Sequence, residues 1–352
     1  MASLNINPGM VSFILKINNC KKEKMEIEFK TRTGAIYSDT EHMMEYIYVG
    51  DYGKENNIKA DFLGLTKEIN GVEHHDVDLD YKLVVTISTQ KGCPMKCMFC
   101  DCPKVGYHGN LSFEEMRMEV ERAIAASGAT HTKRFNLHLA RMGEPMFNYT
   151  NVSALIHALP YIIGRTQLKA DVIHPVLTTM LPKAIQREKL IDLIWGFCQN
   201  LKNEKYDGEA GLQFSINSTD DAQRDALFRG KSHSLVDIAL IADALPMPKG
   251  RKYTLNFPVT AHTILDPKRL SELFDKEKFI VKITPIHETN EAKENGIETN
   301  EGYYTYDVYK QFEQPLLEEG WDVIVFVPSK EEDEDRITCG NALIAQLEKV
   351  QR

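Results

Sequence analysis

Three closely spaced cysteines are the residues of this sequence best suited to chemistry. Cys93, Cys97 and Cys100 follow one another at spacings of four and three in the segment KGCPMKCMFCDCP. Three thiolates can ligate three irons of a 4Fe-4S cluster and leave the fourth iron open, whereas an electron-transfer cluster normally uses four cysteines. Since an open iron can chelate the amino and carboxylate groups of S-adenosylmethionine (AdoMet), the cysteines predict a cluster that binds AdoMet.

The CxxxCxxC spacing is the signature of radical AdoMet enzymes. In such enzymes the reduced cluster passes an electron to the sulfonium, a carbon–sulfur bond breaks, and a 5′-deoxyadenosyl radical abstracts hydrogen from a target. Incidental thiols and a structural zinc site are the alternatives. A zinc site usually has paired CxxC halves or histidines at defined spacings, and the sequence shows neither. Cys102 could be a fourth ligand, but we expect it to be a packed free thiol.

The elements that must position these thiols follow a βα pattern from about residue 83 onward. Short β-branched runs alternate with longer amphipathic runs, as in a parallel α/β sheet. Ligands of such folds bind at the carboxyl ends of the strands, and the cysteine loop follows the first strand. The predicted strands are 83–88, 135–140, 172–177, 212–217, 253–259 and 279–284.

Two helix starts can be read from capping residues. Ser112 and Glu115 form a capping box for the helix that follows, and Asn151 precedes a second apolar helix. A last helix over 303–319 leads to a strand at 321–327.

Both ends of the chain differ from this pattern. The N-terminal part contains short alternating segments at 11–18, 24–31 and 44–50, which predict a small β-rich element. Near the other end, the acidic segment 329–336 is interpreted as a solvated loop.

The composition favours an ordinary globular protein. No run approaches the ~18 apolar residues of a membrane helix, and the first residues lack the layout of a signal peptide, so we expect a cytoplasmic protein with no membrane partner. Four of the seven cysteines lie within 93–102, which suits metal binding in a reducing compartment. The net charge of −9 argues against a broad basic surface for RNA, although 131–134 and 249–252 could form a local basic patch.

Several further segments resemble the RlmN/Cfr family, whose members methylate an adenine ring carbon in 23S ribosomal RNA and, for RlmN, also in transfer RNA. The similarity runs from about residue 40 to 345, in family order. GYHGNLSFEEM is similar to the family's G-F-x-R-N-L-x-x-x-E, and RMGEPMFNYTNV to its G-M-G-E-P-L-x-N-x-x-x-V. The resemblance implies that Gly143 lets backbone approach AdoMet and that the Glu144 carboxylate contacts its ammonium. From the residue alone, Glu144 could also be a solvated carboxylate.

The resemblance implies further AdoMet contacts. LTTMLP resembles the strand that bears the family's S-T-S-G and places Thr178 as a hydroxyl contact. LQFSINSTDDAQRDALF resembles S-L-H-A-x-x-D-x-x-R and places Ser215, Ile216 and Asn217 there. TPIHE resembles I-P-W-N-P and puts His287 where the family has an adenine-binding asparagine, with a hydrogen-bonded structural histidine as the alternative.

Two positions bear on catalysis. EYIYVG resembles E-x-V-Y-I-P, so Glu45 matches the family's proposed proton acceptor, and RITCGNAL resembles A-C-G-Q-L, so Cys339 matches its methyl-carrying cysteine. In that family one AdoMet methylates the cysteine, a second supplies the radical, and the S-methylene group adds to the ring carbon. Such steps need a thiolate nucleophile and a base. Taken alone, Glu45 could equally be a surface strand carboxylate, and Cys339 a buried bystander.

The chain also departs from the family. The cysteine that resolves the protein–RNA adduct is replaced by Thr86, which cannot form the disulfide. The family's N-terminal RNA-binding region is essentially missing, since only about 40 residues precede Glu45. These departures indicate a divergent relative whose substrate need not be ribosomal RNA. Product release could use Cys102, Cys20 or Cys198.

The resemblance thus implies an α/β fold with a partial (β/α)6 radical SAM barrel at 83–328, after a β-rich element at 1–82 and before a C-terminal loop and helix at 329–352 that carry Cys339. The expected function is AdoMet-dependent methylation of an adenine-type ring carbon in RNA (rRNA or tRNA), with electrons from a donor such as flavodoxin or ferredoxin. One alternative is a radical SAM enzyme that acts on a non-RNA substrate without a methyl-carrying cysteine. Another is a non-catalytic Fe-S or zinc protein.

Overall fold

The computed structural model describes residues 26–31, 34–50, 68–69, 72–73, 79–297, 306–326 and 343–344. Four of the sequence predictions fall outside these residues. They concern Cys20, Cys339, the N-terminal segment 11–18 and the acidic segment 329–336.

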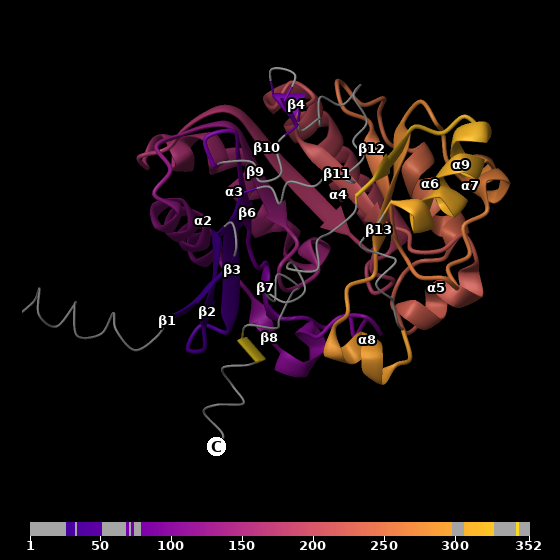
Figure 1. The fold of residues 1–352 in the computed structure, drawn as a ribbon, viewed down its shortest axis with the longest axis horizontal. Coiled ribbons are helices and arrows are strands. Elements are labelled where there is room, and N and C mark those ends of the chain that lie inside the picture. Colours follow the sequence, from indigo (N-terminus) through magenta and orange to yellow (C-terminus); the bar gives the residue numbers. More distant parts are fainter. Residues whose placement is uncertain are drawn as a thin grey trace, which may run out of the picture.

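A single ten-stranded sheet organises the described residues, with the N-terminal strands at one edge (Figure 1). Its order is β1-β2-β3-β6-β9-β10-β11-β12-β13-β14. The strands are β1 (Glu26–Lys30), β2 (Gly34–Asp39), β3 (Met44–Val49), β6 (Lys82–Thr86), β9 (His131–Leu139), β10 (Lys169–Thr179), β11 (Gly211–Ser215), β12 (Tyr253–Val259), β13 (Phe279–Pro285) and β14 (Val323–Val325). Two short hairpins stand apart from it, formed by β4 (Glu68–Ile69) with β5 (Val72–Glu73) and by β7 (Gln90–Gly92) with β8 (Tyr107–Asn110).

In the main sheet, strands β6, β9, β10, β11, β12, β13 and β14 are mutually parallel, and each pairs with the next of these along the chain. Right-handed crossovers between such neighbours place the connecting helices on the same face of the sheet. On β9 that face carries the fully buried Phe135, Leu137 and Leu139, while the alternate positions Asn136 and His138 face the other side. The fold is therefore the α/β arrangement of a partial barrel, as predicted, with an apolar outer face and a polar inner face.

The helices follow the strands in the predicted order. They are α2 (Phe113–Ser127), α3 (Tyr149–Gly164), α4 (Arg187–Gly196), α5 (Asp221–Leu227), α6 (Leu235–Asp243), α7 (Pro267–Leu273), α8 (Asn290–Glu294) and α9 (Lys310–Glu318). Shorter turns are η2 (Cys102–Val105), η3 (Pro145–Asn148) and η6 (Asp307–Tyr309), and a π-helix, η4 (Phe197–Lys205), continues α4. None of the helices in the described ranges has the length and apolar character needed to cross a membrane.

Capping explains where the first helices begin. The predicted capping box of α2 is present, because Ser112 Oγ accepts from Glu115 N at 3.2 Å and the Glu115 carboxylate accepts from Ser112 N at 2.8 Å. The prediction for α3 was wrong by one turn. The helix begins at Tyr149, after η3, so Asn151 lies inside it and donates to Asn148 Oδ1 at 2.9 Å.

The N-terminal strands that the structure describes extend the barrel sheet. β1, β2 and β3 form an antiparallel meander, and β3 pairs with β6 through Ile47 and Thr86. The predicted segments at 24–31 and 44–50 are confirmed as β1 and β3, whereas β2 was not predicted. The meander places Glu45 beside the carboxyl end of β6, where the cysteine loop begins.

Candidate active site

The cysteine loop leaves the carboxyl end of β6 and is closed at its base by the β7–β8 hairpin. Gly92 has a φ of +75°, and a Cβ there would lie 1.5 Å from the carbonyl oxygen of Gly106, so only glycine lets the two ends of the loop approach this closely. Within the loop, Lys96 also has a positive φ, of 59°. A loop of this shape brings thiols that are distant along an extended chain into one place.

Cys93, Cys97 and Cys100 are free thiols, each partly buried by residue exposure. Burial, and then the negative charge of Cys100, raise the pKa of Cys93 to about 12. Burial together with Cys100 and Cys93 raises the pKa of Cys97 well above its usual value. Cys93 packs with Cys100 against one apolar cluster and with Cys97 against another, so the three thiols lie near one another. Cys102 is instead buried with its sulfur 3.6 Å from the Arg141 carbonyl, which supports a packed thiol.

The donor set at the cysteine loop consists of three free thiols. Among the residues that the structure describes, no three His, Cys, Asp or Glu side chains converge on a point where a single ion would be ligated. A structural zinc needs four ligands around one point. In a 4Fe-4S cluster each thiolate binds a different iron, so the ligands surround a volume instead. Three neighbouring thiols without disulfides satisfy that requirement.

Glu144 lies beside these thiols and is nearly fully buried, with 3% of its surface exposed. Its carboxylate accepts from Thr179 Oγ1 at 2.7 Å and from the backbone N–H groups of Met146 and Met180 at 3.0 Å. Burial raises the pKa of Glu144 to about 7, and these three hydrogen bonds oppose the rise. Glu144 is among the groups that raise the pKa of Cys93 and Cys97, so it lies near the cysteine loop.

Gly143 is required by packing that can be seen in the structure. Its φ is +105°, and an added Cβ would lie 2.7 Å from the side chain of Gln90. Gln90 Oε1 in turn accepts from Glu144 N at 2.9 Å. The glycine thus lets the GEP turn approach β7, so that Glu144 is held over the cysteine loop.

A buried asparagine with a positive φ lies just after the end of β11. Asn217 has a φ of +64° and is 1% exposed, and within the described part of the chain neither its amide nitrogen nor its amide oxygen has a hydrogen-bond partner. β11 was predicted to run to this residue, but it ends at Ser215, because Ile216 N and Asn217 N both donate to Asn256 O. Strained backbone and unpaired buried amides gather at ligand sites. Asn217 therefore fits a contact to a polar cofactor such as AdoMet.

The other predicted AdoMet residues lie at or after strand ends. Thr178 is half-buried on the inner face of β10, while its neighbour Thr179 holds Glu144 from the opposite face. Ile216 has no exposed surface. His287 is half-buried and follows β13, and its carbonyl accepts from Thr289 N at 2.9 Å.

Glu45 is completely buried and joins the site to the C-terminal segment. It forms an ion pair with Arg141, with 2.6 Å between Oε1 and Nε, although that N–H is not aligned as a hydrogen bond. Its other oxygen accepts from Leu343 N at 3.0 Å. Leu343 packs in one cluster with Cys102 and Met142, against which Cys93 and Cys100 also lie. The C-terminal segment thus touches the cysteine loop four residues after Cys339.

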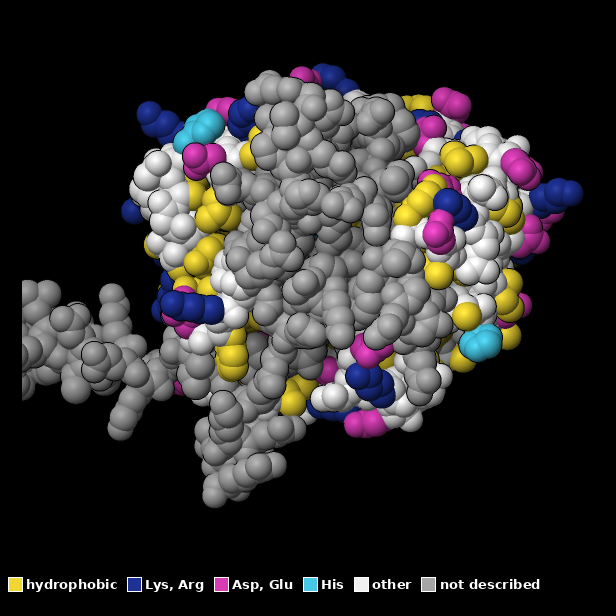
Figure 2. Space-filling view, viewed as in Figure 1, with side chains coloured by type: hydrophobic (Ala, Val, Ile, Leu, Met, Phe, Trp, Pro, Cys, Tyr) yellow, Lys and Arg dark blue, Asp and Glu magenta, His cyan; other side chains and the backbone are white. Residues whose placement is uncertain are grey.

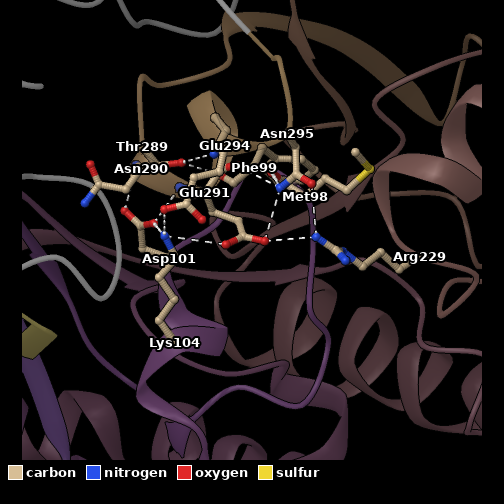
Figure 3. Close-up of polar contacts among 11 residues, drawn as sticks. Met98, Phe99, Asp101, Lys104, Arg229, Thr289, Asn290, Glu291, Glu294 and Asn295 are labelled. Carbon is tan, nitrogen blue, oxygen red and sulfur yellow. Dashed lines mark hydrogen bonds and ion pairs between the residues drawn. The ribbon is translucent and has the colours of Figure 1, made fainter.

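Figure 3 shows a polar network, here called the α8 clasp, that ties the cysteine loop to the segment after β13. The buried Asp101 carboxylate accepts from Asn290 N at 3.2 Å and from Glu291 N at 2.8 Å. Thr289 Oγ1 donates to Phe99 O at 3.0 Å. The remaining members are Asn295, which donates to Met98 O, Lys104, which pairs with Glu291 and Glu294, and Arg229, which pairs with Glu291.

The α8 clasp spans the open side of the barrel mouth. Four strands lie between β6 and β13 in the sheet, yet the loops that follow these two strands are hydrogen-bonded to each other. The clasp therefore fixes the cysteine loop to the segment after β13. Asp101 was not predicted as a functional residue, although a single carboxylate between two cysteines is visible in the sequence. Arg224 was not predicted either, although it matches the final arginine of the motif S-L-H-A-x-x-D-x-x-R.

Comparisons with known proteins agree with this geometry. No family model matches the chain. The dual-specificity RNA methyltransferase RlmN of Sorangium cellulosum is 26% identical over 274 residues, covering 76% of this chain and 63% of that protein. A protein of Thermosynechococcus vestitus named probable dual-specificity RNA methyltransferase RlmN is 27% identical over 234 residues, 64% of this chain and 61% of that protein. The chain thus spans about three fifths of the length of these curated relatives.

A solved structure confirms the fold. The crystal structure of a radical SAM methyltransferase from Sphaerobacter thermophilus superimposes with a TM-score of 0.56. The match covers 93% of this chain and 84% of that chain at 15% sequence identity. At this identity the likeness concerns the fold, which is the one that the sequence predicted.

Proposed function

We propose that this chain, a divergent relative of the RlmN proteins, is a radical SAM enzyme that methylates an adenine-type ring carbon in RNA. One observation carries the proposal. The thiols of Cys93, Cys97 and Cys100 gather at the carboxyl end of a parallel sheet, beside the buried carboxylate of Glu144. The names of the relatives supply the substrate class.

In this proposal the three thiolates hold a 4Fe-4S cluster, and AdoMet lies between the cluster and the strand ends. When bound, the pair would supply a hydrogen-abstracting carbon radical after one-electron reduction by a donor such as flavodoxin or ferredoxin. Glu144 orients the site by fixing Met180, whose sulfur lies 3.9 Å from Cys97 Sγ. Gly143 and Thr178 shape the approach of AdoMet, and Asn217 offers the unpaired amide.

The remaining contacts of AdoMet are assigned by the resemblance. Ser215 and Ile216 would meet it at the end of β11, and His287 would meet its adenine after β13. All three stand at strand ends that open to the same side of the sheet.

Cys339 is proposed as the methyl carrier. It lies outside the described residues, but the Glu45–Leu343 hydrogen bond anchors the chain only four residues further on. Four residues span at most about 14 Å. Glu45 thus anchors Leu343 beside the cysteine loop, in addition to any role as proton acceptor.

Product release needs a different route from that of the family, because Thr86 ends β6 and pairs with Ile47. Cys198 is an unsuitable substitute, since it is fully buried in the core on the outer face of the sheet. Cys102 packs in one cluster with Met142 and Leu343 and remains a candidate for this step.

The first test is anaerobic reconstitution with iron and sulfide, followed by assay of 5′-deoxyadenosine from AdoMet. We expect about four irons per chain in the wild type and 5′-deoxyadenosine on reduction. Cys97→Ser should abolish both. Cys198→Ala is the matched control, because it removes a buried thiol from the other face and should keep both. A wild-type protein without cluster iron would refute the proposal.

The second test concerns methyl transfer. Mass spectrometry of protein made with intact AdoMet supply should detect S-methylcysteine at Cys339, and cellular RNA incubated with the enzyme should gain methyladenosine. Persistently unmodified Cys339 would refute the family mechanism while leaving the cluster in place.

One observation favours a second candidate, a radical SAM enzyme with a non-RNA substrate. The two basic segments that could have formed an RNA patch are paired with acids: Arg134 and Arg251 with Glu209, Lys252 with Asp322, and Lys249 with Asp207. Figure 2 shows basic and acidic side chains interspersed over the visible described surface. Retained substrate turnover by Cys339→Ala would decide for this candidate, since it needs no methyl carrier.

A further inference from the structure

Arg224 is a buried cation near the cysteine loop. It lies in α5 and is only 2% exposed. Its guanidinium donates to His233 O at 2.7 Å, to Ser232 Oγ at 2.6 Å, and over longer distances to Met180 O and Ser215 O. The side chain thus joins the ends of β10 and β11, both of which carry proposed AdoMet contacts.

All of these partners are neutral. Among the residues that the structure describes, no carboxylate lies within ion-pair distance of Arg224, and its Nε has no hydrogen-bond partner. The acids that act on it electrostatically, Asp221 and Asp225, are exposed to solvent, which screens them. A buried charge without a counter-charge is costly, and proteins pair such groups or place them beside a metal site.

An aromatic side chain links Arg224 to the cysteine loop. The Arg224 guanidinium stacks over the Phe228 ring at 4.8 Å, and Phe228 contacts Phe99 of the loop edge to face at 5.8 Å. Phe228 also packs in one cluster with Met180, against which Cys93 and Cys97 lie. Cys97 is itself among the groups that act electrostatically on Arg224.

The end of α5 and the turn after it are also hydrogen-bonded to the backbone of the cysteine loop. Met98 N donates to Leu227 O at 3.0 Å, and Lys231 Nζ donates to Pro94 O. These bonds fix α5 and the turn after it to both halves of the cysteine loop, so the position of Arg224 relative to the thiols is set on several sides.

We propose that Arg224 is the buried counter-charge of the cluster held by Cys93, Cys97 and Cys100, and that this positioning residue raises the midpoint potential of the cluster. The inference rests on the proposed function. Net charge near a cluster is one of the factors that set its potential. A cluster on three thiolates is negative and becomes more negative on reduction, so a fixed neighbouring cation stabilises the reduced form.

The test is an EPR-monitored redox titration of the reconstituted holoenzyme. Arg224→Gln removes the charge but keeps a hydrogen-bond donor, and Lys183→Met is the matched control. Lys183 lines the same surface pocket as Arg224, but its side chain is exposed. We expect Arg224→Gln to lower the ratio of reduced to oxidised cluster at least tenfold at the wild-type midpoint, equivalent to 59 mV for one electron. Lys183→Met should leave the ratio unchanged.

A second variant keeps the proposal testable if Arg224→Gln does not fold. Arg224→Lys retains a cation that can lose its proton, so its midpoint potential should fall more steeply between pH 7 and 9 than that of the wild type, in which Glu144 also titrates. Wild-type potentials in Arg224→Gln, or a wild-type pH profile in Arg224→Lys, would overturn the inference. A wild-type protein that assembles no cluster would refute the proposed function itself, which is a different result.

Discussion

Two buried arginines flank the cysteine loop, and they are compensated in opposite ways. Arg141 forms an ion pair with Glu45 at 2.6 Å, so its charge is neutralised within the protein. Arg224 is equally buried, yet its partners are carbonyl and hydroxyl oxygens. The first arrangement is complete without a ligand and holds the C-terminal segment in place. The charge of Arg224 is balanced only when an anion lies nearby, and a thiolate-bound cluster would be such an anion.

The largest expected effect comes from breaking the complete pair. Glu45→Gln would remove the carboxylate that forms the buried ion pair with Arg141, which should lower the free energy of unfolding by about 3–5 kcal/mol. Urea unfolding of the cluster-free protein measures this loss. The double variant Glu45→Gln with Arg141→Met should recover most of it, because no charge then remains buried. A loss below about 1 kcal/mol, the value typical of exposed pairs, would show that the two arginines do not differ.

A third buried cation, Lys202, sharpens the comparison because it lies away from the cysteine loop. Its ammonium donates to Gly208 O and Lys249 O, and burial lowers its pKa from 10.5 to about 8. Between these pH values the folded protein binds fewer protons than the unfolded chain, so the free energy of unfolding should rise with pH, by about 3 kcal/mol in total.

Urea titrations from pH 7 to 10.5 test this expectation. Lys202→Met should flatten the rise, whereas Lys205→Met, an exposed lysine of the same π-helix, should keep it. If the free energy of unfolding rises with pH as steeply in Lys202→Met as in the wild type, Lys202 is not the cause of the rise. Burial without a counter-charge would then not have lowered the pKa of this cation, which would weaken the argument for Arg224.

The α8 clasp offers a smaller effect on the same loop. Asp101→Asn keeps one acceptor for the N–H groups of Asn290 and Glu291 but removes the negative charge, so we expect a loss of about 1–2 kcal/mol. Hydrogen exchange should become faster in α8 and stay unchanged in α2. Equal protection of α8 in both proteins would show that the clasp does not depend on this carboxylate.

The smallest effect is expected at an exposed pair. Asp171→Asn removes the partner of His131, at 3.1 Å on the surface, and should change the free energy of unfolding by less than about 0.5 kcal/mol. A change as large as that of Glu45→Gln would mean that burial is not what distinguishes the pairs.

Much of the fold could be predicted because it depends on local pattern. The alternation of apolar and polar residues in β9 and β12 identifies strands with one buried face, and the capping box at Ser112 identifies the start of α2. Errors arose where local signals compete. Asn151 is as good a capping residue as Asn148, and only the preceding η3 turn decides that α3 begins earlier.

The candidate site also has a part that could be predicted from the sequence and a part that could not. Cysteine spacing and the GEP turn are visible in the sequence, because a short loop leaves three thiols few ways to separate. Which threonine holds Glu144 was not visible, since Thr178 and Thr179 differ only in the face of β10 from which they project. The roles of Asp101 and Arg224 were not visible either, because their partners come from other loops.

By itself, the sequence determined the chemistry that this protein can host. Three thiols at fixed spacing after a β-strand predict a cluster ligand set, and the alternation of strands and helices predicts a parallel sheet that binds its ligands at one end. Only the tertiary structure decided which charges are compensated. Asp101 meets Glu291 across 190 positions of chain, and Glu45 meets Leu343 across 298. Such pairings follow from the curvature of the sheet and the burial it imposes, which no local pattern encodes.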